Sequence, residues 1–565
     1  MAPRVSLTYP EGTRRLSGGS PTASCDAVLA FLLCFVTRIQ HRKAMPSSLS
    51  DALEQLHRPL ALRAMPDGVV AVRFLDETPD HSVPPGHAYV PPIHPEDLGD
   101  PGFRRDHGLR MAYVAGSMAH GIASEEIVES AARAGCLGFY GAAGQAPERV
   151  EQAITRLKAS LGDLPFGFNL LYSPQESSLE TAHADLYLRH QVRLVEASAY
   201  LDVSLPLVRY RLSGLRVGPD GLPVPANKVV AKVSRIEVAR KFLSPAPARL
   251  VGESLARGEI TEQQAQAAAR LPLADDVTAE ADSGGHTDNR PALNLLPTII
   301  ALRDRMAREN AALGWHHPTR VGLGGGIATP HSVAAAFSMG AAYVLVGTVH
   351  QACVESGTSD LARAMLAAAE QADTAMAAAA DMFEMGVKVQ VLKRGTLFAM
   401  RAQKLYDLYR AYPSFEAAPA ADQAVVEKQM LRRPFEAVWA DCVTYFQRRD
   451  PSQITRAQSD PRHKMALVFR WYLATASRWA TQGVPDRQAD YQVWCGPSMG
   501  AFNEWAKGSF LESPANRHLA AVAHSLMRGA ALLKRAEIAR LQGIHSAEVN
   551  PRPVQVSHAA ARIPA

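Results

Sequence analysis

The chain contains 565 residues, of which 47% are hydrophobic and 20% are charged. This length exceeds the roughly 250–300 residues at which one hydrophobic core usually stops growing, so we expect one large domain and one or two smaller ones. The formal net charge of +5 is small for a chain of this size. Charge therefore gives no reason to expect nucleic-acid binding.

The six cysteines lie far apart in the sequence, with no CxxC pair and no histidine nearby at metal-ligand spacing. This pattern is typical of reduced thiols and argues against a zinc site or a disulfide framework. We therefore expect a cytoplasmic protein that binds no metal.

The apolar run Ala27–Val36 is the one membrane-like segment of the sequence. It has about half the length that a helix needs to span a bilayer. "TRIQHRK" follows it where a signal peptide would have small residues for cleavage. We expect residues 1–45 to be a leader, either a buried helix or poorly ordered, and we expect no membrane association.

A small β element and a linker are expected over residues 46–107. "PLALRAMPDGVVAVRFLD" (Pro59–Asp76) contains two apolar, β-like runs with Asp-Gly between them, which indicates a hairpin turn. The proline-rich "PPGHAYVPPIHP" that follows is typical of a linker.

From residue 108 onward, short β-like runs alternate with helical runs. Eight strand candidates occur in series, at 111–116, 136–141, 166–171, 193–198, 228–233, 276–281, 320–326 and 342–347. Each connection is long enough to return the chain for a parallel pairing. Eight such strands within roughly 240 residues favour a (β/α)8 TIM barrel over a doubly wound sheet. We expect the barrel, and hence an α/β fold, over residues 108–357.

Two further regions extend this minimal barrel. Residues 244–276 read as two short helices inserted before the sixth strand, and these helices could form a lid beside the site. Residues 358–565 are mainly helical, and this region could support a homodimer.

The seventh and eighth strands end in small residues, where a TIM barrel places its chemistry. "GLGGGIATP" supplies Gly324, Gly325 and Gly326, and the eighth strand ends in Gly347 and Thr348. Such turns offer convergent N–H donors without Cβ atoms in the way, which suits a phosphate. No GxGxxG fingerprint precedes an acidic residue, so a mononucleotide such as FMN fits better than a dinucleotide. Glycines that merely end a strand are the alternative.

Two polar side chains lie at or near the ends of other strand candidates. Asn169 belongs to the third and Lys232 to the fifth. An amide can donate and accept along a flavin edge, and a lysine near its pyrimidine side stabilises negative charge. Each residue taken alone is also compatible with a helix cap or a surface cation.

Four segments of the sequence carry a resemblance to a known family: "AGSMAHGIASEEIVESAARAGCLGFYGAAG", "SGGHTDNRP", "GLGGGIATP" with "AYVLVGT", and "MFEMGVKVQVLKRGTLFAMRAQKLYDLY". Together they resemble the PfaD family, the trans-acting enoyl reductases of polyunsaturated fatty acid and trans-acyltransferase polyketide synthases. The resemblance covers roughly Pro91 to Gln542, and the last segment lies outside the expected barrel. The family is related to nitronate monooxygenases and to flavin-dependent enoyl reductases.

The resemblance implies an FMN-binding TIM barrel that uses NADPH or NADH. The implied activity is FMN-mediated reduction of the α,β-double bond of enoyl thioesters on an acyl carrier protein, during polyketide or polyunsaturated fatty acid biosynthesis. The flavin-contacting positions that it adds to the glycines, Asn169 and Lys232 are Ala115, Gly116, Met118, Ser283, Gly284 and Gly285.

His286 is the expected catalytic residue. It can donate a hydrogen bond to the thioester oxygen or a proton to the α-carbon. A histidine that satisfies a loop carbonyl is the alternative. Asp288 and Arg290 either pair to order the loop, or Arg290 binds a cofactor phosphate.

Two other functions remain open. The first is a flavin oxidase like the nitronate monooxygenases, although "TDNRP" stands where those enzymes continue with glycine-rich residues. The second is a redox-inactive barrel that serves as a docking component of a synthase.

Acyl carrier proteins are usually acidic, so a basic surface is expected to bind them. The candidate is a set of basic residues among apolar ones in "VKVQVLKRGTLFAMRAQK", namely Lys388, Lys393, Arg394, Arg401 and Lys404. A solvated helix face is the alternative.

Overall fold

The computed structural model describes residues 48–77, 81–174, 177–311 and 319–555. The expected leader, with its apolar run Ala27–Val36, lies outside these residues. Contacts divide the chain into two compact units. The first contains the described residues up to Pro95 together with Arg528–Pro551, and the second runs from Glu96 through Met527. No helix among the described residues combines the length and apolar character needed to cross a bilayer.

The first unit contains the predicted β element. Its antiparallel sheet has the order β2-β1-β3, with β1 (Leu60–Ala64), β2 (Val70–Phe74) and β3 (Ala88–Val90). The expected Asp-Gly turn joins β1 to β2, since Gly68 has a φ of 81° and Asp67 accepts a hydrogen bond from the Val69 N–H. Arg535 from α21 (Leu519–Leu541) donates to the carbonyl of Leu53 in α2 (Leu49–Glu54) at 2.8 Å.

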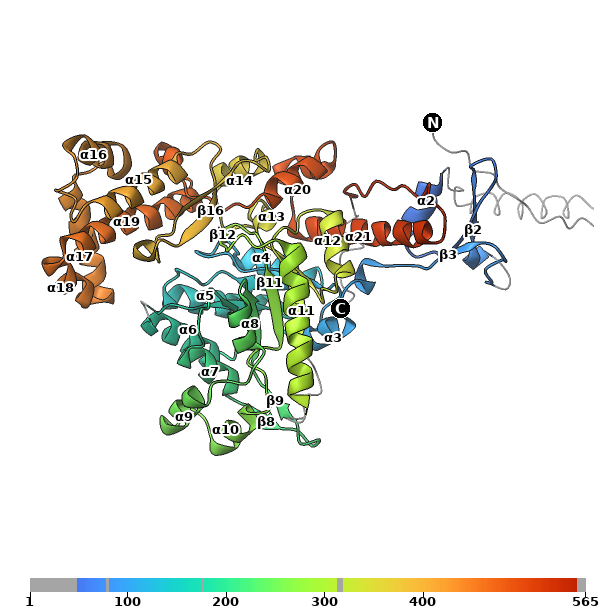
Figure 1. Ribbon diagram of the computed structural model, residues 1–565, viewed down its shortest axis with the longest axis horizontal. Helices are drawn as coiled ribbons and strands as arrows, with labels where there is room; N and C mark the ends of the chain where they lie inside the picture. The colour runs from blue at the N-terminus through green and yellow to red at the C-terminus, as the bar shows by residue number, and fades with distance from the viewer. Residues whose placement is uncertain (1–47, 78–80, 175–176, 312–318, 556–565) are drawn as a thin grey trace, which may run out of the picture. The chain divides into compact units, whose positions relative to one another are not determined.

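The second unit is built around a closed barrel of eight parallel strands, which confirms the predicted fold (Figure 1). Its strands are β4 (Tyr113–Ala115), β5 (Leu137–Tyr140), β6 (Gly167–Leu171), β7 (Leu194–Ser198), β10 (Lys228–Val233), β11 (Asp276–Glu280), β13 (Arg320–Gly324) and β14 (Val344–Val346). Neighbours in the barrel follow chain order, and β14 closes on β4. Each of the eight predicted runs therefore supplies one strand.

Helices follow the strands and cover the barrel. They are α4 (Glu125–Arg133), α5 (Pro147–Leu161), α6 (Ser177–Arg189), α7 (Leu205–Leu212), α8 (Ile236–Phe242), α11 (Ala292–Glu309), α12 (Pro330–Ser338) and the short α13 (Thr348–Gln351). Local signals explain where several of them begin. Ser124 caps α4 by accepting from the Ile127 N–H, and Thr329 forms a capping box with Ser332 at the start of α12.

A buried ion cluster closes the N-terminal end of the barrel. Asp276, at the start of β11, accepts from His107 Nε2 at 2.7 Å and from Arg320 Nε at 2.6 Å. His107 belongs to α3 (Pro101–His107), whose Phe103 ring stacks on Tyr343 at 4.2 Å. Because the Asp276 side chain is fully buried, these two donors are needed to offset the cost of removing a carboxylate from water.

The inserted helices are present but do not form a lid, so that expectation was wrong. The insertion forms α9 (Ala248–Ala256) and α10 (Glu262–Ala268), which contact α7 and the hairpin of β8 (Arg216–Val217) and β9 (Pro223–Val224). The segment connects the end of a helix to the start of β11, so it lies at the N-terminal ends of the strands. Figure 1 shows it at the opposite end of the barrel from β12 (Gly285–His286).

The region after the barrel is mainly helical, as predicted. Its helices are α14 (Asp360–Ala367), α15 (Phe398–Ala411), α16 (Ala420–Val425), a π-helical turn (Val426–Leu431), α17 (Phe435–Arg449), α18 (Pro451–Ser459), α19 (Pro461–Gln482), α20 (Ser498–Ala506) and α21. Helices α15 to α19 gather beside the barrel at the left of Figure 1. The sequence did not predict a small sheet of order β12-β16-β15, in which β15 (Thr374–Ala378) and β16 (Lys388–Leu392) join a barrel loop.

Candidate active site

The glycine turns after β13 and β14 are shaped for close approach of a ligand. Gly325 and Gly326 have φ values of 83° and 73°. A Cβ at Gly325 would lie 2.6 Å from the Ala281 carbonyl oxygen, whereas at Gly326 and at Gly347 it would meet nothing within 4 Å. Open space beside backbone N–H groups is what a phosphate requires.

The turn after β11 lies against the same end of the barrel. A Cβ at Gly284 would lie 2.9 Å from Thr348 Oγ1 and 2.9 Å from the Cys495 nitrogen. The neighbouring Ser283 Oγ is buried and has no hydrogen-bond partner among the described residues. A buried hydroxyl without a partner is costly, and a bound ligand would satisfy it.

The end of β4 completes this part of the rim. The Gly116 N–H donates to the Val346 carbonyl at 3.0 Å, and a Cβ at Gly116 would lie 2.5 Å from Leu345 Cδ2. Ala115 is fully buried, and Met118 is half-buried beyond the strand end. Ala115 and Gly116 therefore lie next to the end of β14, whereas the Met118 backbone lies against Gly141, which follows β5.

Lys232 and two carboxylates form an ionic cluster in the barrel. Its ammonium lies 3.3 Å from Glu280 Oε1 and 3.7 Å from Glu196 Oε2. Glu196 is fully buried, and its Oε2 accepts from the N–H and the hydroxyl of Ser117. Its Oε1 has no partner among the described residues.

The buried cluster shifts the pKa of both charged partners. Burial raises the pKa of Glu196, and the Lys232 ammonium offsets only part of this effect. Burial also acts to lower the pKa of Lys232, but the Glu280 and Glu196 carboxylates outweigh it and raise that pKa above its usual value. Lys232 is thus a largely buried cation that is stabilised by two carboxylates, and not a surface lysine.

Asn169 lies beside Glu196 in the register of β6 and β7. Its Oδ1 accepts from the Ala143 N–H at 2.9 Å, which fixes the orientation of the amide. The Nδ2 group has no hydrogen-bond partner among the described residues. It is therefore the end of this amide that can bind another molecule.

His286 belongs to β12, which pairs with β16 from outside the barrel. Its Nε2 lies 3.1 Å from Asp381 Oδ1, and the two side chains are 38% and 49% exposed. Burial acts to lower the pKa of His286, but the carboxylates of Asp381 and Glu280 outweigh it and raise that pKa. Among the residues that the structure describes, His286 makes no hydrogen bond to a loop carbonyl, and its partner is the Asp381 carboxylate.

The loop after His286 is ordered by a pair that the sequence did not predict. Asp288 accepts from Arg235 Nε at 2.9 Å and from Ser234 Oγ at 2.6 Å. Of the two alternatives left open by the sequence, the pairing of Asp288 with Arg290 is replaced by the pairing of Asp288 with Arg235. Arg290 is exposed, and its carbonyl accepts from the Asp282 N–H.

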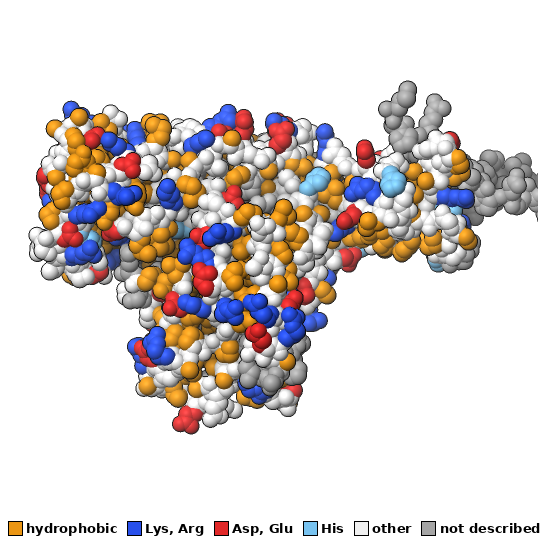
Figure 2. All heavy atoms as spheres, viewed as in Figure 1, with side chains coloured by type: hydrophobic (Ala, Val, Ile, Leu, Met, Phe, Trp, Pro, Cys, Tyr) orange, Lys and Arg blue, Asp and Glu red, His pale blue; other side chains and the backbone are white. Residues whose placement is uncertain are grey.

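The basic residues proposed to bind a carrier protein do not form one surface. Arg401 is only 13% exposed and is paired with the buried Asp490, so its inclusion was wrong. Arg394 lies 3.1 Å from Asp373, and Lys404 lies 2.6 Å from Asp422. Figure 2 likewise shows cationic and anionic side chains interspersed over the visible face.

Lys388 and Lys393 are the two members of that set that are exposed and have no ion-pair partner among the described residues. They stand at opposite ends of β16, with Lys388 as its first residue and Lys393 directly after its last.

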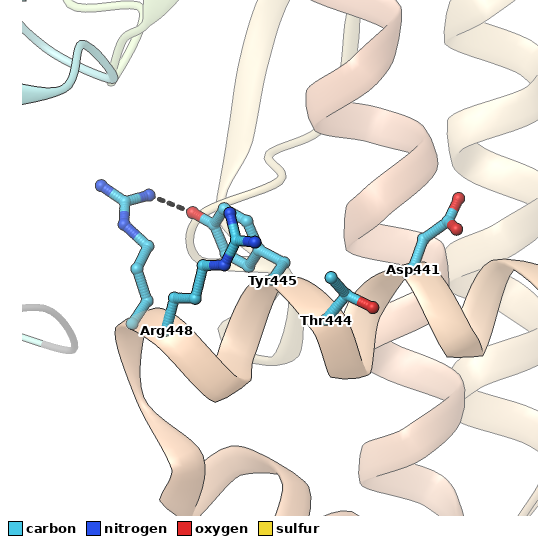
Figure 3. A pocket seen from close by; sticks show the side chains of 5 residues that line it. Asp441, Thr444, Tyr445 and Arg448 are labelled. Carbon is cyan, nitrogen blue, oxygen red and sulfur yellow. Dashed lines mark hydrogen bonds between the residues drawn. The ribbon is translucent and has the colours of Figure 1, made fainter.

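A surface hollow of about 450 Å³ lies on α17, away from the residues described above. It is lined by Asp441, Thr444, Tyr445, Arg448 and Arg449 (Figure 3). The Arg449 guanidinium donates to the Tyr445 hydroxyl, and Asp441 is paired with Arg433. We do not assign it a catalytic role, because its charged groups lie on an open helix surface.

Several residues of the rim escaped the sequence analysis. Glu196 had a signal, because it is a carboxylate within the apolar run "RLVEAS". Asp381 and Trp494 had no such signal in the sequence, because they come from segments outside the barrel. The Trp494 indole stacks on the His120 ring at 5.6 Å with an interplanar angle of 13°.

Comparisons with known proteins agree with this architecture. A sequence model of the nitronate monooxygenase family matches residues 109–408. A model of the inserted helical domain of acyl-carrier-protein S-malonyltransferase matches residues 412–491. The first match covers the barrel and the small sheet of β12, β16 and β15, and the second covers helices α16 to α19.

Relatives with 38% identity or more include two curated proteins and one solved structure. One polyunsaturated fatty acid synthase polypeptide of Thraustochytrium sp. is 42% identical over 539 residues, which are 92% of this chain and 36% of that polypeptide. Polyketide biosynthesis protein PksE of Bacillus subtilis is 42% identical over 442 residues, 78% of this chain and 57% of PksE. The chain thus spans less than two thirds of either curated relative.

The third relative is a solved structure, the enoyl reductase domain of MlnA from the macrolactin biosynthesis cluster of Bacillus amyloliquefaciens. It superposes with a TM-score of 0.74 and 38% identity, covering 78% of this chain and 99% of that domain. Its coverage and the family match across the barrel lead to one assignment: the chain belongs to the PfaD-like enoyl reductases, which are related to the nitronate monooxygenases.

Proposed function

We propose that the chain is an NAD(P)H-dependent, FMN-mediated enoyl reductase that acts on enoyl thioesters carried by an acyl carrier protein. The observation that carries this proposal is the convergence of open glycine turns, the unpartnered Ser283 hydroxyl and the paired His286 at one end of a closed barrel. The expected setting is polyketide or polyunsaturated fatty acid biosynthesis.

The residues at this end fit FMN. Gly326 and Gly347 leave open space beside the backbone, and the buried Ser283 hydroxyl lacks a partner among the described residues, so both suit a phosphate. The Asn169 amide and the Lys232 ammonium would face the polar edge of the ring. Bound FMN would supply the hydride chemistry that no amino-acid side chain provides.

The remaining chemistry belongs to the chain. Reduction of the double bond adds one hydride, which derives from NAD(P)H, to the β-carbon and one proton to the α-carbon. His286 would donate that proton, or a hydrogen bond to the thioester oxygen where negative charge builds up. Its raised pKa favours the protonated imidazole, which can donate the proton and in which both ring nitrogens are hydrogen-bond donors.

The carrier partner is supported by the kind of proteins that this chain resembles. The relatives are part of a polyunsaturated fatty acid synthase, a polyketide biosynthesis protein and an enoyl reductase domain from a biosynthesis cluster. The match of residues 412–491 to a helical domain of a carrier-protein transferase points to the same class of partner. Lys388 and Lys393 are the basic contacts that we retain from the sequence.

A nitronate monooxygenase-like oxidase is the second candidate, because that family model matches the barrel. The two activities differ in their electron donor and acceptor. The oxidase would take electrons from a nitronate and pass them to oxygen, whereas the reductase would take them from NADPH and pass them to the enoyl thioester. Purified protein loaded with FMN should be yellow and lose its flavin absorbance on anaerobic addition of NADPH. A crotonyl thioester should then restore the absorbance.

The same experiment distinguishes the alternatives. Restoration by oxygen with turnover of an alkyl nitronate, but not by the thioester, would contradict the enoyl reductase and support the oxidase. Protein that remains colourless and binds no FMN on titration would instead support a redox-inactive docking component.

A further inference from the structure

We propose that Asp381 is a positioning residue of the reductase, which orients His286 and keeps its imidazole protonated for the reaction. Neither the barrel nor the glycine turns contain this carboxylate. The proposal rests on the proposed function, in which His286 is the proton or hydrogen-bond donor. Asp381 acts through His286, and we assign it no contact with substrate.

The carboxylate is held in place from two directions. It follows β15, at the start of the turn toward β16, and the Ala379 N–H donates to the Val387 carbonyl at 2.9 Å to extend this hairpin. Arg470 of α19 donates from Nε to the Ala380 carbonyl at 2.9 Å. The turn is therefore anchored both to the sheet and to the helical region.

The partner strand fixes the imidazole in the same way. β12 pairs with β16, where Gly285 lies opposite Gln390 and His286 lies opposite Val389. This pairing ties the loop after β11 to the sheet that carries Asp381. The 3.1 Å contact thus joins His286 of β12 to Asp381 in the turn between β15 and β16, and β12 is hydrogen-bonded to β16 of the same sheet.

The charges around His286 favour its protonated form. The groups that act on it electrostatically are Asp381, Glu280 and Lys232, of which the first two are anionic and Lys232 is cationic. Arg470 in turn acts on Asp381, whose pKa is lowered by His286 against the opposing effect of burial. Removing the Asp381 charge leaves the more distant Glu280 opposed by Lys232.

The bond to Asp381 also determines which ring nitrogen is available. Nε2 is engaged by the carboxylate, whereas Nδ1 has no hydrogen-bond partner among the described residues. In a protonated imidazole both nitrogens carry a hydrogen. Nδ1–H is therefore the group that can face a substrate.

The test is a pH titration of the His286 ring in FMN-loaded protein, in which NMR of 13C-labelled histidine monitors the protonation of the ring. The His286→Gln variant identifies the resonance by its loss. In Asp381→Asn we expect the pKa of His286 to fall by about one pH unit or more, because an opposite charge at this distance is removed. Asp381→Glu should restore most of the shift.

Asp441→Asn is the matched control. Asp441 is also an ion-paired aspartate, it is 44% exposed against 49% for Asp381, and it lies on α17 away from the rim. This variant should leave the His286 titration unchanged. In Asp381→Asn, the pH above which enoyl reduction declines should move toward acid by the same amount as the NMR shift.

An unchanged His286 titration in both Asp381→Asn and Asp381→Ser would overturn the proposal. Failure of the proposed function looks different, because wild-type protein would then be inactive with enoyl thioesters while the titration shift persisted. If the pKa of His286 shifted in Asp381→Asn but the pH dependence of enoyl reduction did not move, the role of Asp381 in the reaction would be overturned.

Discussion

Glu196 and Lys232 face each other inside the barrel, with Glu196 Oε2 3.7 Å from Lys232 Nζ and side chains that are 0% and 13% exposed. Glu280 completes the cluster at 3.3 Å from the same ammonium. Each charge is stabilised by its neighbours, so the three residues should behave as a unit in stability and in cofactor binding.

Replacing Lys232 by Met should therefore destabilise the fold. We expect a loss of about 2–3 kcal/mol in the free energy of unfolding, which is less than for a fully buried pair because Glu196 can take up a proton. The double variant Lys232→Met/Glu196→Gln should recover part of this loss. Urea unfolding of the two single variants and the double variant measures the coupling, and strict additivity would show that the residues are independent.

The open glycine turn gives a sharper test of cofactor binding. Gly347 has a φ of −116°, which any residue adopts, and a Cβ there meets nothing within 4 Å. Gly347→Ala should leave the urea midpoint of the apoprotein unchanged. It should weaken FMN binding about tenfold or more, because the methyl group occupies the space proposed for the phosphate.

Fluorescence titration of the apoprotein with FMN measures this effect. Gly252→Ala is a useful contrast, because its Cβ would also meet nothing within 4 Å and its φ is not positive, but it lies in α9, at the opposite end of the barrel from β12 (Figure 1). Equal FMN affinity in wild type and Gly347→Ala would place the phosphate elsewhere.

The ion cluster at the other end of the barrel predicts a pH dependence. Burial acts to raise the pKa of Asp276, but His107 and Arg320 lower it below its usual value. A lowered carboxyl pKa contributes stability above the unfolded-state value, near ~3.9, and loses it as the pH falls through the folded-state pKa. Wild-type protein should therefore lose this contribution below about pH 4.

Asp276→Asn should remove that contribution at neutral pH. We expect a loss of about 3 kcal/mol at pH 7, because Arg320 and His107 lose a buried partner, and a flatter dependence of stability on pH in the acid range. Asp106→Asn removes the other, 41% exposed partner of Arg320 and should cost under about 1 kcal/mol. Thermal unfolding between pH 3 and pH 7 compares the three proteins.

His286→Ala addresses catalysis without disturbing the glycine turns. The variant should bind FMN and be reduced by NADPH as the wild type is, while enoyl reduction slows by about 100-fold or more. His190→Ala is the control, since His190 pairs with Glu151 at the end of α6. Wild-type turnover in His286→Ala would remove this histidine from the reaction.

The sequence predicted the barrel because each strand is a local apolar run and each helix has its own periodicity and caps. The positions of Gly325, Gly326 and Lys232 could be predicted for the same reason, because these residues lie at or near strand ends that the barrel brings together. The prediction of a lid over residues 244–276 was wrong because the helical pattern does not show at which end of the barrel a segment lies. The order of the connections determines that end.

The contacts that escaped prediction join distant segments. Asp381 reaches His286 only through the pairing of β12 with β16, and that register is not visible in either segment alone. Arg401 looked like a surface cation because nothing local reveals that Asp490 packs on it. Asp288 likewise pairs with Arg235, which follows a different strand.

The most direct test of the enoyl reductase assignment is the mass of the acyl chain after reaction. Crotonyl-acyl carrier protein should be incubated anaerobically with NADPH and the FMN-loaded chain, and the intact carrier analysed by mass spectrometry. We predict conversion to the butyryl thioester, a gain of two hydrogen atoms that requires both NADPH and the chain. Unchanged crotonyl-carrier in the presence of protein that NADPH has reduced would contradict the assignment.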